Sequence, residues 1–488
     1  MATGRARLLH QHWLGVQALR LPLGGLGAIP GSGGFSLPSE ILLKILSYLD
    51  ATTLLCTGCV NRRFYHLAND NFIWIRIYST AFSPKRCNWR IDPVEKTVAS
   101  MNLLSVEDKE AGYWKKEYIA KRIASVKAAL AQVLKLVNPY TGLPAKTKEA
   151  LRISGLGWVI ILKEKSGKEH VMEHADLFIN HSSVMVVWYS KNWPSLATLS
   201  TLDLCGVTPV LMDWHKPPTK NGPRWPSLVA KYSLSNLTDS TLVGCDRFVR
   251  IFHLNPGLLV GLWKRAEELA FVMANLHFHH LVEKAHWARP PCTYPSIVHL
   301  VFVKCSCSPE YGLHGYQLHV DLHSSGTFYL CSTFRNLFTK QGDTEFLLQF
   351  EKKRSIHAAA NGYIENGYVK LIVIHFQNST EHLPLIGKVG LSWRTDVFDG
   401  CIKSCSVMDV TLLDEYGKPF WCFSSPVCMQ SSANPSDGPY FVGPTYCIDY
   451  EDSTGTMHME LVWIEETEEY FIVSMVLYLS IAKINHWS

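Results

Sequence analysis

Apolar residues recur at helical spacing near the start of the chain. From Ile41 to Leu49 they occupy positions i, i+1, i+4, i+5 and i+8, which predicts a short helix with a broad apolar face. Pro38 suits the first turn of this helix, and Glu40 complements its dipole. Asp50 is placed to cap a second short helix, and a third begins about ten residues later. A segment of about 40 residues seldom buries so much apolar surface alone, so we expect part of it to bind a partner.

From Leu151 onward the pattern changes to short β-rich runs separated by Gly, Pro, Asn and Asp. Regularly spaced short strands predict an antiparallel sandwich or a barrel-like fold. The apolar run 470–482 is too short for a membrane span and is typical of a buried strand. We expect one helix in this region, from Ala266 to Lys284. The other predicted strands cover 158–162, 184–189, 248–252, 258–263, 298–303, 317–322, 368–376, 407–413 and 457–464.

A helical stretch from Leu103 to Leu136 joins the two regions. Its apolar residues keep near-helical spacing, so we expect an amphipathic connector that packs on the domain after it. The predicted fold class is α+β: a small all-helical domain, a helical connector and a large antiparallel β-rich domain with one or two subdomains. The predicted divisions are a disordered leader at 1–35, the helical domain at 36–80, the connector at 81–150 and the β-rich region at 151–488. A subdivision of the last is expected near 290 or within 341–367.

Composition narrows the class of protein. The chain has 488 residues, of which 47% are hydrophobic and 18% charged, as in a folded globular protein. A net charge of +5 without a Lys/Arg run predicts no nucleic-acid partner, and no apolar run is long enough for a membrane helix. Fourteen irregularly spaced cysteines without a secretory leader indicate reduced thiols, hence a cytoplasmic or nuclear protein. The arginines and missing acids of residues 1–35 also resemble a mitochondrial presequence, but we favour a disordered leader.

The most suggestive group of polar residues is His319, Asp321 and His323, which alternate onto one face of a predicted strand. Neighbouring Cys305 and Cys307 offer further metal-binding side chains. The spacing matches no common zinc motif, however, and a solvent-facing strand surface explains it without an ion. We therefore expect no metal and no cofactor.

Other residues that could take part in catalysis, redox chemistry or metal binding have simpler explanations. Cys56 and Cys59 have CxxC spacing but lie in the predicted helices, so we expect them to pack in a core. The histidines of 277–280 suit the end of the predicted 266–284 helix. Cys401 and Cys405 are expected to be buried thiols. The sequence contains no phosphate-binding loop, nucleophile elbow or HExxH motif, so we expect no enzyme.

The first helical segment resembles the F-box. The family pattern opens with Leu-Pro-x-Glu-Ile-Leu, continues with Ile-Leu-x-x-Leu, and closes with a Val-Cys-Arg-x-Trp-like turn and a later Trp. This sequence departs from it at Asn61, where Cys is usual, and at Phe64, where Trp is usual. The resemblance to one group within this family extends over nearly the whole chain and weakens at 13–36 and 341–366. Segments that carry it include NDNFIWIRIYSTAFSP and LYLSIAKINHW. The matching F-box residues are Leu37, Pro38, Glu40, Ile41, Leu42, Ile45, Leu46, Leu49, Val60, Arg62 and Trp74.

The resemblance implies a non-catalytic receptor subunit of an SCF-type ubiquitin ligase. In that family the F-box docks on the Skp adaptor, which connects it to the cullin and RING subunits. The remaining domain holds a protein substrate, unidentified here, for ubiquitination and proteasomal degradation. The substrate-binding residues are unknown. The residues that the resemblance assigns to adaptor binding are Leu37, Pro38, Glu40, Ile41, Leu42, Ile45, Leu46, Leu49, Leu54, Leu55, Val60 and Trp74.

Two alternatives stay open from the sequence. The chain could dock on the adaptor as a non-degradative scaffold. The β-rich region could instead be an enzyme or a ligand-binding module, although no catalytic motif supports an enzyme.

Overall fold

The computed structural model describes residues 37–82, 109–208, 225–284, 316–337, 368–375, 383–432 and 443–480, except 267, 336 and 415. The chain divides into two compact units. The first comprises Met1–Leu130 with Thr208–Trp225, and the second comprises Ala131–Val207 with Pro226–Ser488. The leader at 1–35 and the predicted strand at 298–303 lie outside the described residues. Of the helices in the described ranges, none combines the length and apolar character that a membrane span requires.

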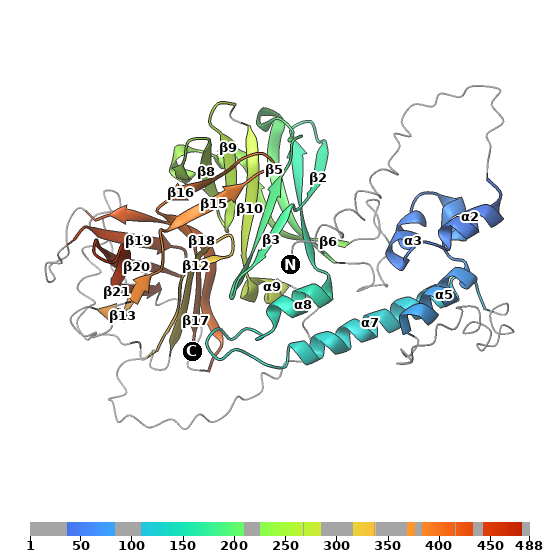
Figure 1. Ribbon diagram of the computed structural model, residues 1–488, viewed down its shortest axis with the longest axis horizontal. Coiled ribbons are helices and arrows are strands. Elements are labelled where there is room, and N and C mark those ends of the chain that lie inside the picture. The colour runs from blue at the N-terminus through green and yellow to red at the C-terminus, as the bar shows by residue number, and fades with distance from the viewer. Residues whose placement is uncertain are drawn as a thin grey trace, which may run out of the picture. The chain divides into compact units, whose positions relative to one another are not determined.

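The first unit is helical, and its short helices begin at polar caps. The Asp50 carboxylate accepts a hydrogen bond from the Thr53 N–H at 2.8 Å, and the Asn61 side chain accepts one from the Phe64 N–H at 2.9 Å. Each cap satisfies a backbone donor that the first helical turn leaves free. The described helices, drawn in blue and cyan in Figure 1, are α2 (Ser39–Leu46), α3 (Ala51–Thr57), α4 (Arg62–Leu67), α5 (Asn71–Phe82) and α7 (Tyr113–Val133).

Helix α7 packs back on the helices before it. Its buried Tyr118 and Ile123 share one core with Leu54 and Trp74. The Trp74 and Tyr118 rings lie 5.5 Å apart. The start of α7 is also fastened, because Asn71 donates to the carbonyl oxygens of residues 109 and 110 at 3.2 and 3.1 Å. The aromatic side chains of this stretch therefore complete the core of the preceding helices, a role that was not predicted from the sequence.

Within the described residues, the second unit is built from antiparallel strands in four sheets. The strands before α9 are β1 (Gly157–Glu164), β2 (Glu169–Glu173), β3 (Asp176–Ile179), β4 (Ser183–Tyr189), β5 (Leu199–Thr208), β6 (Trp225–Ser233), β7 (Leu242–Cys245), β8 (Val249–Leu254), β9 (Leu258–Trp263) and β10 (Leu269–His277). Those after it are β11 (Gln317–Ser324), β12 (Thr327–Phe334), β13 (Tyr368–His375), β14 (Leu383–Leu385), β15 (Gly390–Arg394), β16 (Asp399–Lys403), β17 (Cys405–Leu413), β18 (Pro419–Ser431), β19 (Thr445–Glu451), β20 (Gly455–Ile464) and β21 (Glu469–Ser480). Two short helices, α8 (Thr147–Ser154) and α9 (Phe278–Lys284), accompany them.

The first ten strands form a sandwich. A four-stranded sheet in the order β2-β1-β5-β6 faces a six-stranded sheet in the order β3-β4-β10-β9-β8-β7. Trp158 and Leu204 of the smaller sheet pack with Val186 and Val272 of the larger one in a single buried cluster. Side chains from the two inner faces thus form one core between the sheets, as in other sandwiches.

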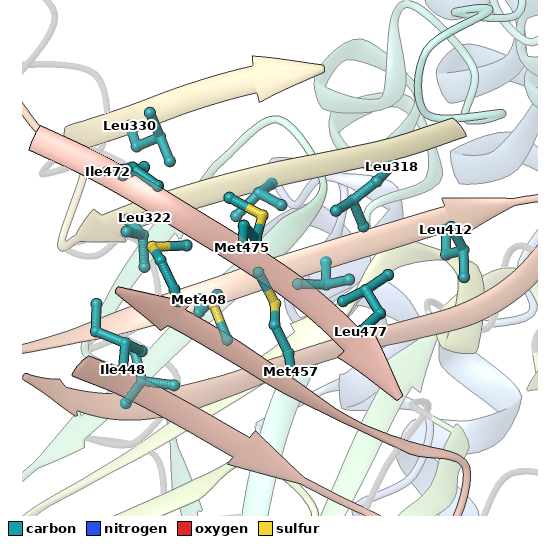
Figure 2. Close-up of a cluster of buried hydrophobic side chains, with 14 of the residues drawn as sticks. Leu318, Leu322, Leu330, Met408, Leu412, Ile448, Met457, Ile472, Met475 and Leu477 are labelled. Atoms are coloured by element: carbon teal, nitrogen blue, oxygen red, sulfur yellow. The ribbon is translucent and has the colours of Figure 1, made fainter. Parts of the chain in front are cut away.

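The later strands form a nearly closed, barrel-like sheet in the order β12-β11-β17-β18-β19-β20-β21-β13. Strand β14 also pairs with β21, and just beyond it the Ile386 N–H donates to the Tyr329 carbonyl oxygen of β12 at 2.9 Å. That bond links the two ends of the sheet. The interior is filled by aliphatic and methionine side chains, including Leu318, Met408 and Met475 (Figure 2).

The six-stranded sheet is shared between the two halves of this unit. Its second face contributes Met185 and Phe271 to a cluster that also contains Trp393 and Ile402 of the hairpin β15–β16 and Val407 of β17. The sheet is therefore covered by apolar side chains on both faces. In Figure 1 its green strands lie beside the orange strands of the barrel-like sheet.

The α+β fold class is confirmed, and each predicted strand within the described ranges coincides with an observed one. Many further strands, such as β2, β5 and β18, were not predicted individually. The predicted helix at 266–284 is wrong. Residues Leu269–His277 form β10, and only Phe278–Lys284 are helical. Because β10 lies inside the six-stranded sheet, almost all of its side chains are buried, and the resulting continuous apolar run carries no strand alternation. The change from sandwich to barrel-like sheet falls between α9 and β11.

Candidate functional site

The first unit exposes a line of large apolar side chains along α2. Leu37 and Ile41 are each 48% exposed, Ile45 is 50% exposed and Tyr48 is 74% exposed. Ile41 and Ile45 stand four residues apart and share one face of α2, while Leu37 lies just before the helix and Tyr48 just after it. We call these four residues the exposed strip. Of the 18 large hydrophobic residues exposed in the described ranges, seven lie between residues 37 and 72.

The residues assigned to adaptor binding divide between surface and interior. Those that lie at the surface are Leu37, Pro38, Glu40, Ile41, Ile45 and Val60. Leu42 and Leu49 are half-buried. The others, Leu46, Leu54, Leu55 and Trp74, belong to the core of the unit and offer almost no surface to a partner. Their part is to hold α2 in place, since Leu46 anchors the buried face of the helix that carries Ile41 and Ile45 outside.

One hydrogen bond ties the start of the exposed strip to α4. The Arg63 guanidinium donates to the carbonyl oxygen of Leu37 at 2.6 Å. The nearby departure from the family pattern at Asn61 is explained by its cap on α4. Phe64 is half-buried against the core and retains the apolar part of a tryptophan.

The CxxC cysteines do not have the surroundings of a redox pair. Cys56 is half-buried, and Cys59 is exposed, so the prediction that both pack in the core is wrong for Cys59. Burial of its sulfur raises the pKa of Cys59, and the nearby Lys115 ammonium only partly opposes this. Its thiol donates to the Leu55 carbonyl oxygen at 3.4 Å. A raised pKa disfavours the thiolate that redox chemistry needs.

The second unit buries the polar face of β11. His319, Asp321 and His323 are at most 7% exposed, which corrects the expectation that this face meets solvent. The His323 ring lies 2.9 Å from the Asp409 carboxylate of β17, and Ser424 donates to the same carboxylate at 2.5 Å. Charged groups at zero exposure require such partners. A solvent-facing strand surface therefore no longer explains these three residues, and that was the argument against a metal site.

Two residues distant in sequence adjoin this face. His181, between β3 and β4, lies 3.7 Å from the Cys331 sulfur of β12 and 3.9 Å from Asp321. Hydrogen bonds from His181 and His319 lower the pKa of the Cys331 thiol. Sequence inspection missed both His181 and Cys331, because neither belongs to a local motif.

His277 and His279 lie in the interior of the second unit, whereas His280 is exposed. All three lie at or directly before the start of α9 and not at the end of a helix as expected. His277 contacts the Thr411 hydroxyl at 3.0 Å, and His279 contacts the Thr141 carbonyl oxygen at 2.7 Å. Burial holds the pKa of His277 well below its ordinary value. Of the two later cysteines expected to be buried, Cys405 is buried and Cys401 is exposed.

The second unit contains a cavity of about 280 Å³ beside β15, β9 and β10. Its walls combine aromatic side chains, Trp193, Trp263 and Phe398, with the charged Lys191 and Glu268. The volume is just below the range of about 300–1,000 Å³ typical of small-molecule sites. No predicted site residue lines it. The cavity could not be predicted from the sequence, because three separate segments of the chain form its wall.

Comparison with known proteins found a family model that matches the helical segment and relatives that match nearly the whole chain. An F-box-like family model matches residues 35–80. F-box only protein 15 of Homo sapiens is 64% identical over 527 residues, covering 100% of this chain and 99% of that protein. The Mus musculus protein of the same name is 53% identical over 453 residues, covering 92% and 99%. A protein of Arthroderma otae, named as a probable E3 ubiquitin ligase complex SCF subunit, sconB, is 36% identical over 63 residues, or 12% of this chain and 9% of its own. This chain belongs to the F-box only protein 15 family.

Proposed function

We propose that this chain is the substrate-recognition subunit of an SCF-type E3 ubiquitin ligase. In this role the exposed strip docks on the Skp adaptor, and the β-rich unit holds a protein substrate. Cullin and RING subunits bring the ubiquitin-charged enzyme to that substrate for ubiquitination and degradation. The chain contributes no reacting group, because its effect is to raise the local concentration of a substrate lysine at the thioester. We place this activity in the cytoplasm or nucleus.

The exposed strip is the observation that carries the proposal. Ile41 and Ile45 are about half exposed although α2 has a well-packed buried face through Leu46. Clustered exposed apolar side chains on a folded domain mark interaction surfaces. The F-box-like match over residues 35–80 supports a protein partner of the F-box type, and the Arthroderma otae relative supports an SCF assembly.

Surface charge on the strip tests the docking step. The double substitution Ile41→Glu with Ile45→Glu places two carboxylates where the adaptor would bury apolar surface. We expect the variant to lose co-purification of the adaptor from cells. Val171→Glu is the matched control, because Val171 is 54% exposed on β2 of the other unit. Unchanged adaptor recovery with the double variant would contradict the docking role.

Measurements of protein turnover distinguish a substrate receptor from a non-degradative scaffold. If the chain delivers substrates for degradation, the same double variant should cause specific proteins to accumulate relative to the Val171→Glu control. Quantitative proteomics with and without a proteasome inhibitor measures this. A strip variant that loses the adaptor but alters no protein level would favour the non-degradative scaffold.

The cavity beside Trp263 favours a second candidate function, binding of a small ligand by the β-rich unit. A ligand that occupies it should raise the melting temperature of the full chain by mass action. The same ligand should fail to stabilise a Trp263→Ala variant. A compound screen in which no ligand distinguishes the two chains would remove this candidate.

A further inference from the structure

Four side chains with metal-binding atoms converge where the sandwich meets the barrel-like sheet. They are His181 from the β3–β4 turn, His319 and Asp321 from β11, and Cys331 from β12. The register of the β11–β12 pair sets Asp321 directly opposite Cys331 and His319 opposite Thr333. Because His319 and Asp321 are two residues apart on one strand, their side chains lie on the same face.

The separations are those of ligands around one ion. His181 Nδ1, Asp321 Oδ1 and Cys331 Sγ all lie within 4.8 Å of one another. His181 Nδ1 is 3.7 Å from Cys331 Sγ and 3.9 Å from Asp321 Oδ1, while His319 Nε2 is 3.4 Å from the same oxygen. Tetrahedral zinc, with bonds of about 2.0–2.3 Å, holds neighbouring ligand atoms roughly 3.3–3.6 Å apart. Separations of up to 4.8 Å exceed this range, so side-chain movements of about one ångström would close the site.

Two buried polar atoms at the centre face each other at 3.4 Å without forming a well-oriented hydrogen bond. They are Asp321 Oδ1, on a side chain with 0% exposure, and His319 Nε2, on a side chain with 9% exposure. A buried carboxylate that lacks full compensation is costly. A cation at this point would satisfy the oxygen and the imidazole nitrogen together.

The surroundings orient these atoms inward. His319 Nδ1 lies 2.7 Å from the Thr333 hydroxyl, the kind of second contact that fixes a metal-binding imidazole. Ser182 donates to the other Asp321 oxygen at 3.3 Å, which leaves Oδ1 for the ion. The Phe328 ring stacks on His181 with centroids 4.6 Å apart. His323 takes no part, because its ring is held by Asp409.

We propose that His181, His319, Asp321 and Cys331 bind one zinc ion. Two imidazoles, a carboxylate and a thiolate form a ligand set that suits Zn²⁺, and the carboxylate and thiolate balance its two charges. Zinc replaces the proton on the Cys331 sulfur and any protons on the His181 and His319 nitrogens that face the ion, and all of these protons go to solvent. His181 and Cys331 are exposed, so the ion has a path in. With four protein ligands the site is structural, and it fastens the β3–β4 turn of the sandwich to β11 and β12 of the barrel-like sheet.

Metal analysis of the purified full-length chain tests the proposal. We expect about one zinc per chain, falling to near zero in Cys331→Ser and in His181→Gln. Cys401→Ser is the matched control, since Cys401 is an exposed cysteine of the same unit and should leave zinc unchanged. Thr333→Val, which removes only the contact to His319, should weaken zinc binding by about 10–100-fold.

A spectroscopic measurement protects the test against variants that fail to fold. The wild-type chain, stripped with a chelator and given Co²⁺, should show a thiolate-to-cobalt charge-transfer band that Zn²⁺ abolishes. Folded wild type with neither bound zinc nor this band would overturn the proposal and leave Asp321 in an ion pair with protonated imidazoles. Zinc retained at full stoichiometry by Cys331→Ser would also overturn it. Neither result bears on docking by the exposed strip.

Discussion

The indole Nε1 of Trp74 donates a hydrogen bond of 2.7 Å to the carbonyl oxygen of Ala68, inside the core of the helical unit. The Trp74 side chain is fully buried, and its ring contacts Tyr118 of α7. The late tryptophan of the F-box pattern therefore joins the short helices to the helix that follows them. In the proposed docking on the adaptor, Trp74 acts indirectly, through the position of α2.

Trp74→Phe keeps the ring in the core but removes the donor to Ala68. We expect it to destabilise the helical unit by about 1 kcal/mol, and Trp74→Ala by about 3–5 kcal/mol through cavity formation. Amide hydrogen exchange over α2–α5 measures both. Tyr48→Ala, at an exposed position, should leave exchange unchanged. Equal exchange in Trp74→Phe and Tyr48→Ala would show that the hydrogen bond adds nothing measurable.

Gly261 of β9 faces Phe271 of β10, and a methyl group added to it would lie 2.5 Å from the Phe271 ring. The ring cannot easily retreat, because it stacks on Trp393 at 5.5 Å. Gly261→Ala should lower the free energy of unfolding of the β-rich unit by about 1–3 kcal/mol. Urea unfolding followed by near-ultraviolet circular dichroism measures this change. Gly206→Ala on β5, whose added methyl group meets its nearest atom at 3.7 Å, should be much milder.

His253 of β8 makes the β-rich unit sensitive to acid. Burial lowers the pKa of His253 from 6.5 to about 4, and its Nε2 has no hydrogen-bond partner. Between pH 6.5 and 4 the unfolded chain binds a proton that the folded chain excludes. Stability from this residue is therefore complete above pH 6.5 and falls with pH, by at most about 1.4 kcal/mol per pH unit.

Replacing the imidazole isolates this effect. In urea titrations at pH 7 and pH 5, His253→Leu should lose less stability on acidification than the wild type. His66→Leu, at an exposed position on α4, should keep the wild-type loss. If His253→Leu and the wild type lose the same stability, another group causes the acid sensitivity.

The local parts of this structure were predictable from sequence. The helix at Ile41–Leu46 and the cap at Asp50 depend on neighbours within one or two turns, so spacing and residue type were enough. The strand Leu258–Trp263 was likewise bounded by turn residues. In contrast, β10 was mistaken for helix because both of its faces are covered by partners far away in the chain.

The polar face of β11 shows the same limit more sharply. The alternation of His319, Asp321 and His323 is visible in the sequence. The residues that cover these side chains could not be predicted from it. Ser182 is 139 residues from Asp321, and Asp409 is 86 residues from His323. Burial set by such distant contacts turned an expected solvent-facing surface into a buried group of candidate metal ligands. In the F-box helices, the spacing identified the apolar residues but not their exposure. Only the structure shows that Ile41 is exposed and Leu46 is buried.

The division between outside and inside also predicts unequal effects on adaptor affinity. Ile45→Glu should weaken adaptor binding by at least about 2 kcal/mol, roughly thirtyfold in Kd, without changing exchange in the core. Leu54→Ala should weaken binding only as far as it raises exchange over α2. Titration calorimetry with the purified adaptor, paired with hydrogen exchange, measures both quantities. Lost affinity at Ile45 accompanied by unfolding of α2 would contradict a direct contact.

Photo-crosslinking can show whether the exposed strip itself touches the adaptor. A photoreactive amino acid replaces Ile41 or Ile45 in the exposed strip, or Val171 as the control, and the full chain is irradiated with the purified adaptor. Docking through the exposed strip predicts crosslinks to the adaptor from positions 41 and 45 and none from position 171. A stable complex that crosslinks from neither strip position, or that crosslinks equally from position 171, would contradict docking through the exposed strip.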